Sequence, residues 1–305
     1  MTTDATFSTN IARTPYEKEL RQHWDSKQHD DVNLLLGELD GLYHHHFGYG
    51  DYDPAVLLGE GQQREQKMIA ELHRLESDQV SLILDVLGDI GPEHCVMDAG
   101  SGRGGTSFMI HDRYGCAIDG VNFSQYQIAF AEQLAEQRHC ADRVRFHYQN
   151  MAATTFPDGH FHRVISNETT MYGDLYEFFS EFSRVLTPGG RYVAVTWCRD
   201  DAVEFSSPDV EQIDQHYVCH VHRRSTYFKA LAAAGLAPIH VEDFTEQALP
   251  YWELREQSSL ATGVEQPYLS AYRAGHMNYL LIVADRVVPD QPSSRPLRNP
   301  KGNNE

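Results

Sequence analysis

Five polar side chains stand where apolar stretches of the chain are expected to end as strands: Asp98, Asn122, Asn150, Asn167 and Glu168. In an open parallel sheet the ligand lies at the carboxyl ends of the strands, so we expect these side chains to share one pocket. An amide can hydrogen-bond a hydroxyl group, and a carboxylate can accept a proton. Each residue alone could equally cap a strand or a helix, but the agreement of several positions favours a binding site that contains a base.

The segment 96–105 carries the first of these positions into a glycine-rich turn, Gly100-Ser101-Gly102, and apolar residues then continue as a helix. Glycines let the backbone turn sharply and approach a ligand closely, because no Cβ is in the way. The free N–H groups at the start of a helix can hold a polar or anionic group. The segment therefore predicts a nucleotide-type pocket after a first strand.

Strands and helices alternate around this turn, which predicts an α/β fold with a mostly parallel seven-stranded sheet. After the first strand, strands are expected at 116–122, 143–148, 161–166, 191–197, 237–244 and 279–284. Helices are expected at 16–27, 66–87, 125–138, 176–186, 225–234 and, as one helical segment, 246–272. Pro188-Gly189-Gly190 is expected to break the chain before the fifth strand.

The same pattern predicts four regions along the chain. Residues 1–14 and 289–305 are polar and are expected to be disordered. Residues 15–94 form a helical N-terminal segment with a lid, and residues 95–288 form the main domain. Insertions near 199–222 and 246–275 are expected to cap the sheet.

Composition excludes several classes of protein. The net charge is −19, whereas nucleic-acid binding favours a basic surface. The five cysteines lack metal-ligand spacing and fit free thiols in a reducing compartment. The N-terminus lacks a signal-peptide core, and no apolar run approaches the roughly 20 residues that span a bilayer. A cytoplasmic protein without a membrane or nucleic-acid partner is expected, and a homo-oligomer is left open.

The turn Asp98-Ala99-Gly100-Ser101-Gly102, the break Leu186-Thr187-Pro188-Gly189-Gly190 and the seven-strand alternation resemble the class I S-adenosylmethionine (SAM)-dependent methyltransferases, a Rossmann-like family. A nicotinamide dehydrogenase is the competing interpretation, but it favours Gly-x-Gly-x-x-Gly and an acid where Asn122 stands. By resemblance, Gly100 and Gly102 turn under the amino-acid portion of the cofactor. The resemblance also implies a set of SAM-binding residues: Asp98, Asn122 on the ribose, Gln127, Asn150 and Met151 beside adenine, and Asn167 near the sulfonium.

Further motifs narrow the resemblance. The lid loop, residues 41–50 (Gly-Leu-Tyr-His-His-His-Phe-Gly-Tyr-Gly), is similar to the lid of cyclopropane fatty acid synthases and sterol C-methyltransferases. Together with 69–77, 167–172 and 249–255, it resembles the geranyl diphosphate 2-C-methyltransferases over about residues 15 to 288. That resemblance implies C-methylation of a prenyl diphosphate, with geranyl diphosphate favoured, and a requirement for Mg²⁺. Isopentenyl or farnesyl diphosphate, another carbon, and cyclopropane or sterol-type chemistry remain alternatives, as does a catalytically silent SAM-binding protein.

The implied reaction needs a base and aromatic rings. Methylation of geranyl diphosphate at C2 leaves a tertiary cation at C3, and the loss of the C2 proton completes the reaction. Glu168 is the candidate base, both by its position and by the resemblance. Aromatic faces stabilise a cation by roughly 0.5–2 kcal/mol each, and the candidates are Tyr49, Tyr172, Tyr251, Trp252 and Tyr279. Each of them could also be a plain core aromatic residue.

The diphosphate needs cations or hydrogen-bond donors. Candidates are Asn33, Arg255 and the run His44, His45 and His46. Consecutive histidines do not converge on one face of a helix or strand, so a buried loop or a substrate-binding lid competes with a metal site there. Mg²⁺ prefers phosphate oxygens and waters with one or two protein carboxylates, and Glu76 is a candidate that acts through water.

Overall fold

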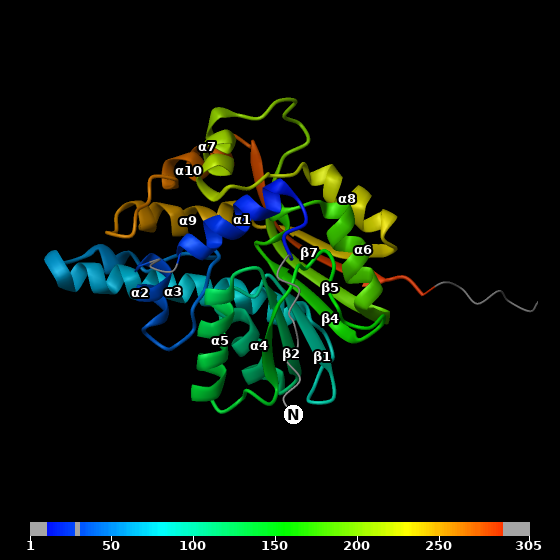
Figure 1. Ribbon diagram of the computed structural model, residues 1–305. Helices are drawn as coiled ribbons and strands as arrows, with labels where there is room; N and C mark the ends of the chain where they lie inside the picture. The colour runs from blue at the N-terminus through cyan, green and yellow to red at the C-terminus, as the bar shows by residue number, and fades with distance from the viewer. Residues whose placement is uncertain (1–10, 28–30, 289–305) are drawn as a thin grey trace, which may run out of the picture.

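The centre of the molecule is a seven-stranded sheet in the order β3-β2-β1-β4-β5-β7-β6 (Figure 1). The computed structural model of the chain describes residues 11–27 and 31–288, so the expected tails at 1–10 and 289–305 lie outside the described residues. All strand pairs are parallel except those that β7 makes with β5 and β6. The strands are β1 (Cys95–Ala99), β2 (Ala117–Asn122), β3 (Val144–Tyr148), β4 (Phe161–Asn167), β5 (Leu186–Arg199), β6 (Leu236–Asp243) and β7 (Met277–Arg286).

Helices cover both faces of the sheet and make two separate cores. On one face, α6 (Leu175–Val185) and α8 (Arg224–Ala233) pack on the strands. The other face carries α3 (Gly61–Val86), α4 (Gly105–Tyr114) and α5 (Gln125–Gln137). That core also contains a group of helices above the sheet, α7 (Pro208–Tyr217), α9 (Thr245–Glu256) and α10 (Glu265–Arg273). The remaining elements are α1 (Pro15–Ser26), α2 (Asp31–Gly37), η2 (Pro54–Leu57) and η3 (Thr170–Tyr172).

The long helix α3 connects the N-terminal segment to the sheet. Its buried side chains recur at helical spacing, as in Leu72, Glu76, Gln79 and Ile83. Two of these four are polar, although a helix face in a core is normally apolar. Glu76 and Gln79 are therefore candidates for a role in the site.

Several boundaries differ from the sequence prediction. Helix α3 begins at Gly61, earlier than the expected 66. The segment 246–272 is two helices: α9 ends at Glu256, and a loop that contains Gly263, whose φ is +91°, separates it from α10. The expected break at 188–190 lies inside β5, where the pairing with β4 shifts between Phe161 and Arg163.

Part of the expected N-terminal tail is ordered around α1. Thr14 accepts a hydrogen bond from the Glu17 N–H, and the Glu17 side chain accepts one from the Thr14 N–H, which makes a capping box. Arg13 pairs with Glu17 and, from α6, Glu177. These contacts hold α1 across the carboxyl ends of the strands (Figure 1).

Candidate active site

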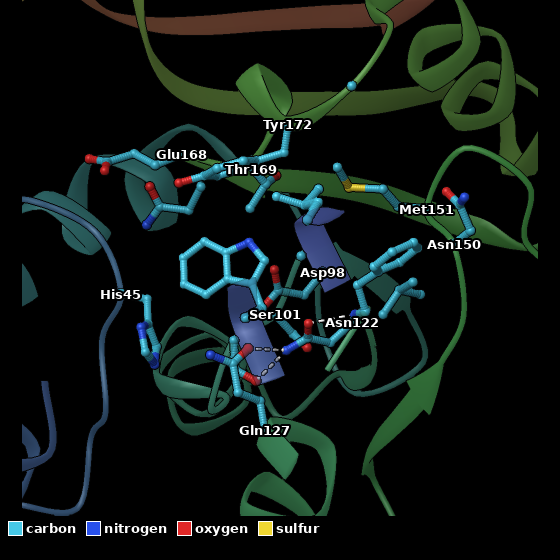
Figure 2. Close-up of a pocket in the computed structure, with 18 of the residues that line it drawn as sticks. His45, Asp98, Ser101, Asn122, Gln127, Asn150, Met151, Glu168, Thr169 and Tyr172 are labelled. Atoms are coloured by element: carbon cyan, nitrogen blue, oxygen red, sulfur yellow. Dashed lines mark hydrogen bonds between the residues drawn. The ribbon is translucent and has the colours of Figure 1, made fainter. Parts of the chain in front are cut away.

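A pocket opens at the carboxyl ends of β1, β2 and β4, under α1 and the lid loop. Asp98, Asn122, Asn150, Asn167 and Glu168 all line it, as the strand-end argument predicts. Figure 2 shows Asp98, Asn150 and Asn122 around one cavity, with Asn122 and Gln127 on one side and Glu168 on the other. The further predicted residues that line the pocket are Gly100, Gly102, Met151, Tyr172, His44, His45 and His46.

The glycine-rich turn shapes the floor of the pocket. Gly100 has φ +88°, and a Cβ there would lie 2.3 Å from Thr169 Cγ2. Thr169 in turn donates to the Ala99 carbonyl at 2.8 Å, which fixes it against the turn. Only glycine therefore combines this backbone conformation with so close a neighbour. The Asp98 carboxylate is buried and accepts a hydrogen bond from Ser107 Oγ at 2.6 Å, while burial raises its pKa to about 6.

The side of the pocket near β2 presents unfilled hydrogen-bonding groups. Asn122 Nδ2 donates to the Gly102 carbonyl at 2.9 Å and to Gln127 Oε1 at 2.7 Å. Among the described residues, Gln127 Nε2 and Ser101 Oγ have no hydrogen-bond partner although both atoms are buried. Buried polar groups are normally paired. This side of the pocket therefore fits a ligand with hydroxyl and charged groups, such as the ribose and amino-acid portions of SAM.

Glu168 lies at the opposite side, directly after β4. Its φ is +54°, a left-handed conformation that is uncommon for a residue other than glycine and that concentrates at functional sites. Oε1 accepts the Phe47 N–H at 3.0 Å and the Tyr279 hydroxyl. Oε2 is buried and has no hydrogen-bond partner among the described residues. One oxygen thus orients the carboxyl group, and the other is left to accept a proton.

Burial dominates the charge state of Glu168. It raises the pKa from the ordinary 4.5 to about 8, against the lowering effect of the hydrogen bonds from Tyr279 and Phe47. The negative charge of Glu76 adds to the increase. A carboxyl group with a pKa near the working pH can act as a general base.

An aromatic cluster surrounds Phe47 of the lid loop, next to Glu168. The ring centroid of Phe47 lies 4.4 Å from that of Trp252 and 5.1 Å from those of Trp197 and Tyr268. Trp252 and Tyr268 stack at 4.0 Å. All of these rings are buried. The cluster therefore forms an apolar, water-excluding region beside the residue whose backbone N–H holds Glu168.

A buried polar cluster lies on the other side of the lid loop. Glu76 Oε1 accepts a hydrogen bond from the Tyr251 hydroxyl at 2.8 Å, and Arg255 Nη1 approaches the same hydroxyl at 3.4 Å. The rings of His44 and His46 lie 4.7 Å apart, and burial lowers the pKa of His46 to about 4. Burial also lowers the pKa of His44. His44 and His46 are therefore neutral donors and acceptors, and Arg255 is the cation of the cluster.

The comparisons with known proteins agree with this geometry. The family model for a methyltransferase domain matches residues 96–190. The geranyl diphosphate 2-C-methyltransferase of Saccharopolyspora erythraea is 46% identical, over 90% of this chain and 96% of that protein. The Streptomyces coelicolor protein of the same name is 44% identical, over 94% of this chain and 100% of that protein. This chain belongs to the geranyl diphosphate 2-C-methyltransferase family.

Solved structures of this family share the fold. A geranyl diphosphate methyltransferase in complex with GPP and sinefungin matches with a TM-score of 0.87 and 45% identity, covering 90% of this chain and 100% of that one. The Streptomyces coelicolor enzyme in complex with Mg²⁺, geranyl diphosphate and S-adenosyl-L-homocysteine matches with a TM-score of 0.86 and 43% identity, covering 90% and 99%. The predicted Rossmann-like methyltransferase fold is confirmed, and the dehydrogenase alternative is set aside.

Some predicted site residues of this methyltransferase lie behind the pocket lining. Tyr279, Tyr251, Trp252 and Arg255 are buried in the layers around Glu168 and Glu76. Asn33 of α2 contacts His45 Nδ1 at 3.2 Å and so supports the lid loop. Tyr49 stacks edge-on against Phe244, with centroids 5.4 Å apart.

Sequence reasoning missed two members of the methyltransferase site. Gln79 Nε2 donates to Asn167 Oδ1 at 2.7 Å and to the Tyr279 hydroxyl at 3.2 Å. Its presence in the buried stripe of α3 was a usable signal. Phe47 gives Glu168 a backbone N–H, which no side-chain pattern reveals.

None of the helices in the described ranges is both long and apolar enough to cross a membrane.

Proposed function

We propose that this chain transfers the methyl group of SAM to C2 of geranyl diphosphate, giving 2-methylgeranyl diphosphate, and that Glu168 accepts the C2 proton. The observation that carries the proposal is the arrangement of the Glu168 carboxyl group. Glu168 lines the pocket, its Oε1 is held by two donors, and its Oε2 is buried with no partner among the described residues. The curated relatives carry the name of this reaction.

The carboxyl ends of β1 to β4 would hold SAM, which supplies an electrophilic methyl group. Gly100 and Gly102 would admit the amino-acid portion close to the backbone. Asn122 and Gln127 would hydrogen-bond the ribose, the latter through its unpartnered Nε2. Asn150 and Met151 would border adenine, and Asp98 and Asn167 would complete the set. Holding donor and alkene in line supplies a large share of the rate acceleration.

The aromatic residues would stabilise the tertiary cation at C3 and exclude water from it. Tyr172 lines the pocket itself, whereas Trp252, Tyr251 and Tyr279 lie in the layer behind it. Each aromatic face contributes roughly 0.5–2 kcal/mol toward a cation. Tyr49, packed on Phe244, would extend this wall. A dry pocket prevents the cation from being trapped by water before Glu168 removes the proton.

The buried cluster of Glu76, Tyr251 and Arg255, with the lid histidines, would receive the diphosphate. Arg255 suits phosphate oxygens, and His44 Nδ1 and His46 Nε2 are buried without hydrogen-bond partners among the described residues. Of this cluster, Glu76 offers the carboxylate oxygen that Mg²⁺ prefers, and the ion would neutralise diphosphate charge. Glu76 would contact the ion through water. Asn33 and His45 would hold the lid loop in place.

The test combines a choice of substrates with a single variant. Protein, labelled SAM and Mg²⁺ are incubated with isopentenyl, geranyl and farnesyl diphosphate, and the products are identified by mass. A methylated geranyl product with the new carbon at C2 is expected. Preference for a prenyl diphosphate of another chain length would change the assigned substrate but not the proposed C-methylation. A product that carries a cyclopropane ring would overturn the proton-removal step.

The variant Glu168→Gln tests the base. We expect SAM binding to remain and turnover to fall by about 10²–10⁴-fold, the usual contribution of a positioned base. Glu246→Gln, an exposed carboxylate on α9, is the matched control and should leave turnover unchanged. Normal product formation by Glu168→Gln would remove Glu168 from the mechanism.

The proposal also includes the cellular compartment and the oligomeric state of the protein. The five cysteines are all unpaired, which supports an enzyme of the reducing cytoplasm. A homo-oligomer stays a prediction, and light scattering on the purified protein checks it.

A further inference from the structure

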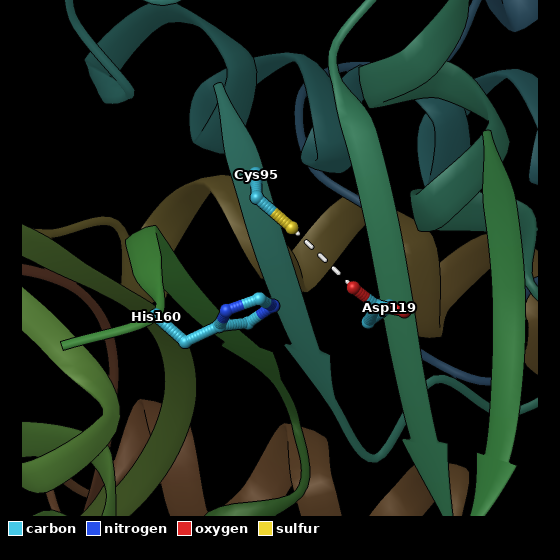
Figure 3. Close-up of side chains that lie close together, drawn as sticks. All are labelled: Cys95, Asp119 and His160. Atoms are coloured by element: carbon cyan, nitrogen blue, oxygen red, sulfur yellow. Dashed lines mark hydrogen bonds between the residues drawn. The ribbon is translucent and has the colours of Figure 1, made fainter. Parts of the chain in front are cut away.

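At the opposite end of the sheet from the active site, three potential metal ligands from separate segments lie together. Cys95 begins β1, Asp119 lies within β2, and His160 lies just before β4. The cysteine sulfur, a carboxylate oxygen and a ring nitrogen of these residues all lie within 4.8 Å of one another. Figure 3 shows the His160 ring turned toward the other two side chains.

From this arrangement we propose that Cys95, Asp119 and His160 bind one Zn²⁺ ion, separate from the Mg²⁺ of methyl transfer. Thiolate and imidazole ligands select Zn²⁺ over Mg²⁺, which prefers oxygen alone. Ligand atoms of a tetrahedral zinc site, with bonds of about 2.0–2.3 Å, lie about 3.3–3.8 Å apart. Cys95 Sγ and Asp119 Oδ2 already lie 3.3 Å apart. A rotation of the exposed His160 ring brings the third ligand in, and water completes the tetrahedron.

The Asp119 carboxylate is held in the orientation that such a site requires. Oδ1 accepts a hydrogen bond from His147 Nε2 at 2.8 Å and lies 3.4 Å from Arg145 Nε. Oδ2 is the oxygen that faces Cys95. His147 therefore fixes the carboxylate through one oxygen and leaves the other for the metal, which is the usual arrangement of outer partners around metal ligands.

The sheet positions Cys95, whereas the exposed His160 ring is bordered by two aromatic rings. Cys95 is paired with Ala117 in the parallel register, so β1 and β2 place its side chain on the same face as that of Asp119. The ring of His160 stacks parallel to Phe156 at 6.0 Å and edge-on to Phe161 at 4.7 Å. When the ion binds, the Cys95 thiol loses its proton to solvent and forms the sulfur–zinc bond, and no oxidation is involved.

The ion would cross-link one loop to the sheet. Residues 149–160 connect β3 to β4, beginning beside Asn150 and Met151 in the SAM pocket and returning to His160. Cys95 and the glycine-rich turn are separated by about 16 Å along β1, at 3.3 Å per residue. Zn²⁺ would thus tie the far end of this loop to β1 and β2 without touching the reacting groups, and would stabilise the folded state by mass action.

The experiment measures zinc binding to the full-length protein, with thiols reduced, bound metals removed and Mg²⁺ present. ZnCl₂ is titrated in competition with a chromophoric chelator. Cys95→Ser and His160→Gln should each weaken binding by about tenfold or more, since even the loss of an outer partner of a ligand has such an effect. His240→Gln, an exposed histidine beside Glu242 on β6, is the matched control and should bind as the parent does.

Two further readouts make the result decisive. Co²⁺ in place of zinc should give a sulfur-to-cobalt charge-transfer band in the parent protein and none in Cys95→Ser. Zinc should raise the melting temperature of the parent and not that of His160→Gln. Because the His160 side chain is exposed, this substitution should not disturb folding, so a lost zinc effect reports the lost ligand. Equal zinc affinity in all four proteins, as binding at the lid histidines would give, overturns the proposal. Methyl transfer is not a readout, so this result and the test of the proposed function are independent.

Discussion

The Tyr279 hydroxyl donates a hydrogen bond to Glu168 Oε1, and the same hydroxyl accepts one from Gln79 Nε2 at 3.2 Å. Tyr279 thereby connects the proposed base to α3. Because the hydrogen bond stabilises the carboxylate form, it lowers the pKa of Glu168 against the larger effect of burial. This contact therefore increases the fraction of the base that is ionised at a given pH, although burial remains the larger influence.

Tyr279→Phe should move the acid limb of the pH profile to higher pH. Loss of the donor raises the pKa of Glu168 above about 8, so kcat/KM falls near pH 7 and recovers as the pH rises. Steady-state rates between pH 6 and pH 9.5 measure the effect, with the exposed Tyr176→Phe as control. A uniform loss at every pH would mean that Tyr279 acts through packing alone.

Glu168→Gln should make the protein more stable in alkaline solution. The folded-state pKa of Glu168 is about 8, raised by burial from 4.5, so its contribution to stability is fully present below about 4.5 and is lost as the pH rises to 8. Glutamine does not titrate. The variant's melting temperature should match the parent's near pH 4.5 and exceed it at pH 9. A difference that stays constant with pH would contradict the raised pKa.

Gln79→Leu should weaken SAM binding and lower the turnover rate together. Asn167 and Tyr279 each lose a partner, and a buried amide left unpaired costs about 1–3 kcal/mol of stability. We expect weaker binding of SAM, measured by calorimetry, and a lower kcat. Gln133→Leu on the exposed face of α5 is the control. If only the melting temperature changed, Gln79 would be structural and would not position the site.

Arg255→Met should raise the KM for geranyl diphosphate while leaving the KM for SAM close to that of the parent. Arg255 is buried beside Glu265, with 3.3 Å between Nε and Oε1. Its loss leaves that buried carboxylate without its cation, although Thr262 and Gly263 still donate to it, and destabilises the fold by up to about 3–5 kcal/mol. Kinetics at 15 °C on protein shown to be folded by circular dichroism separates the two effects. Unchanged KM values for both substrates would place the diphosphate elsewhere.

The position of polar residues at strand ends predicts most of the pocket from the sequence alone. Asn122 and Asn167 end the parallel strands β2 and β4, and Glu168 follows β4, so the topology alone implies that they lie close together. The rule for the carboxyl ends of parallel strands does not cover Tyr279. It lies near the start of β7, and only because β7 is antiparallel does that start reach the same edge of the sheet. Its orientation toward Glu168 is a tertiary property.

Other contributions to the site leave weak traces in the sequence or none. Gln79 was visible as a polar residue in a core stripe, but its partners come from β4 and β7, 88 and 200 residues away. Gly263 did not reveal by itself that 246–272 is two helices. The zinc ligands are 24 and 41 residues apart, so no spacing motif exists, and only the pairing of β1 with β2 brings the first two together.

The Phe47 N–H bond ties the proposed base to the backbone of the lid loop. Because the donor belongs to the backbone, replacing the side chain at position 47 does not remove it. The bond lowers the pKa of Glu168 against the larger effect of burial. The segment that encloses the carboxyl group therefore also moderates its proton affinity, so a change in the path of that backbone would alter the protonation of Glu168.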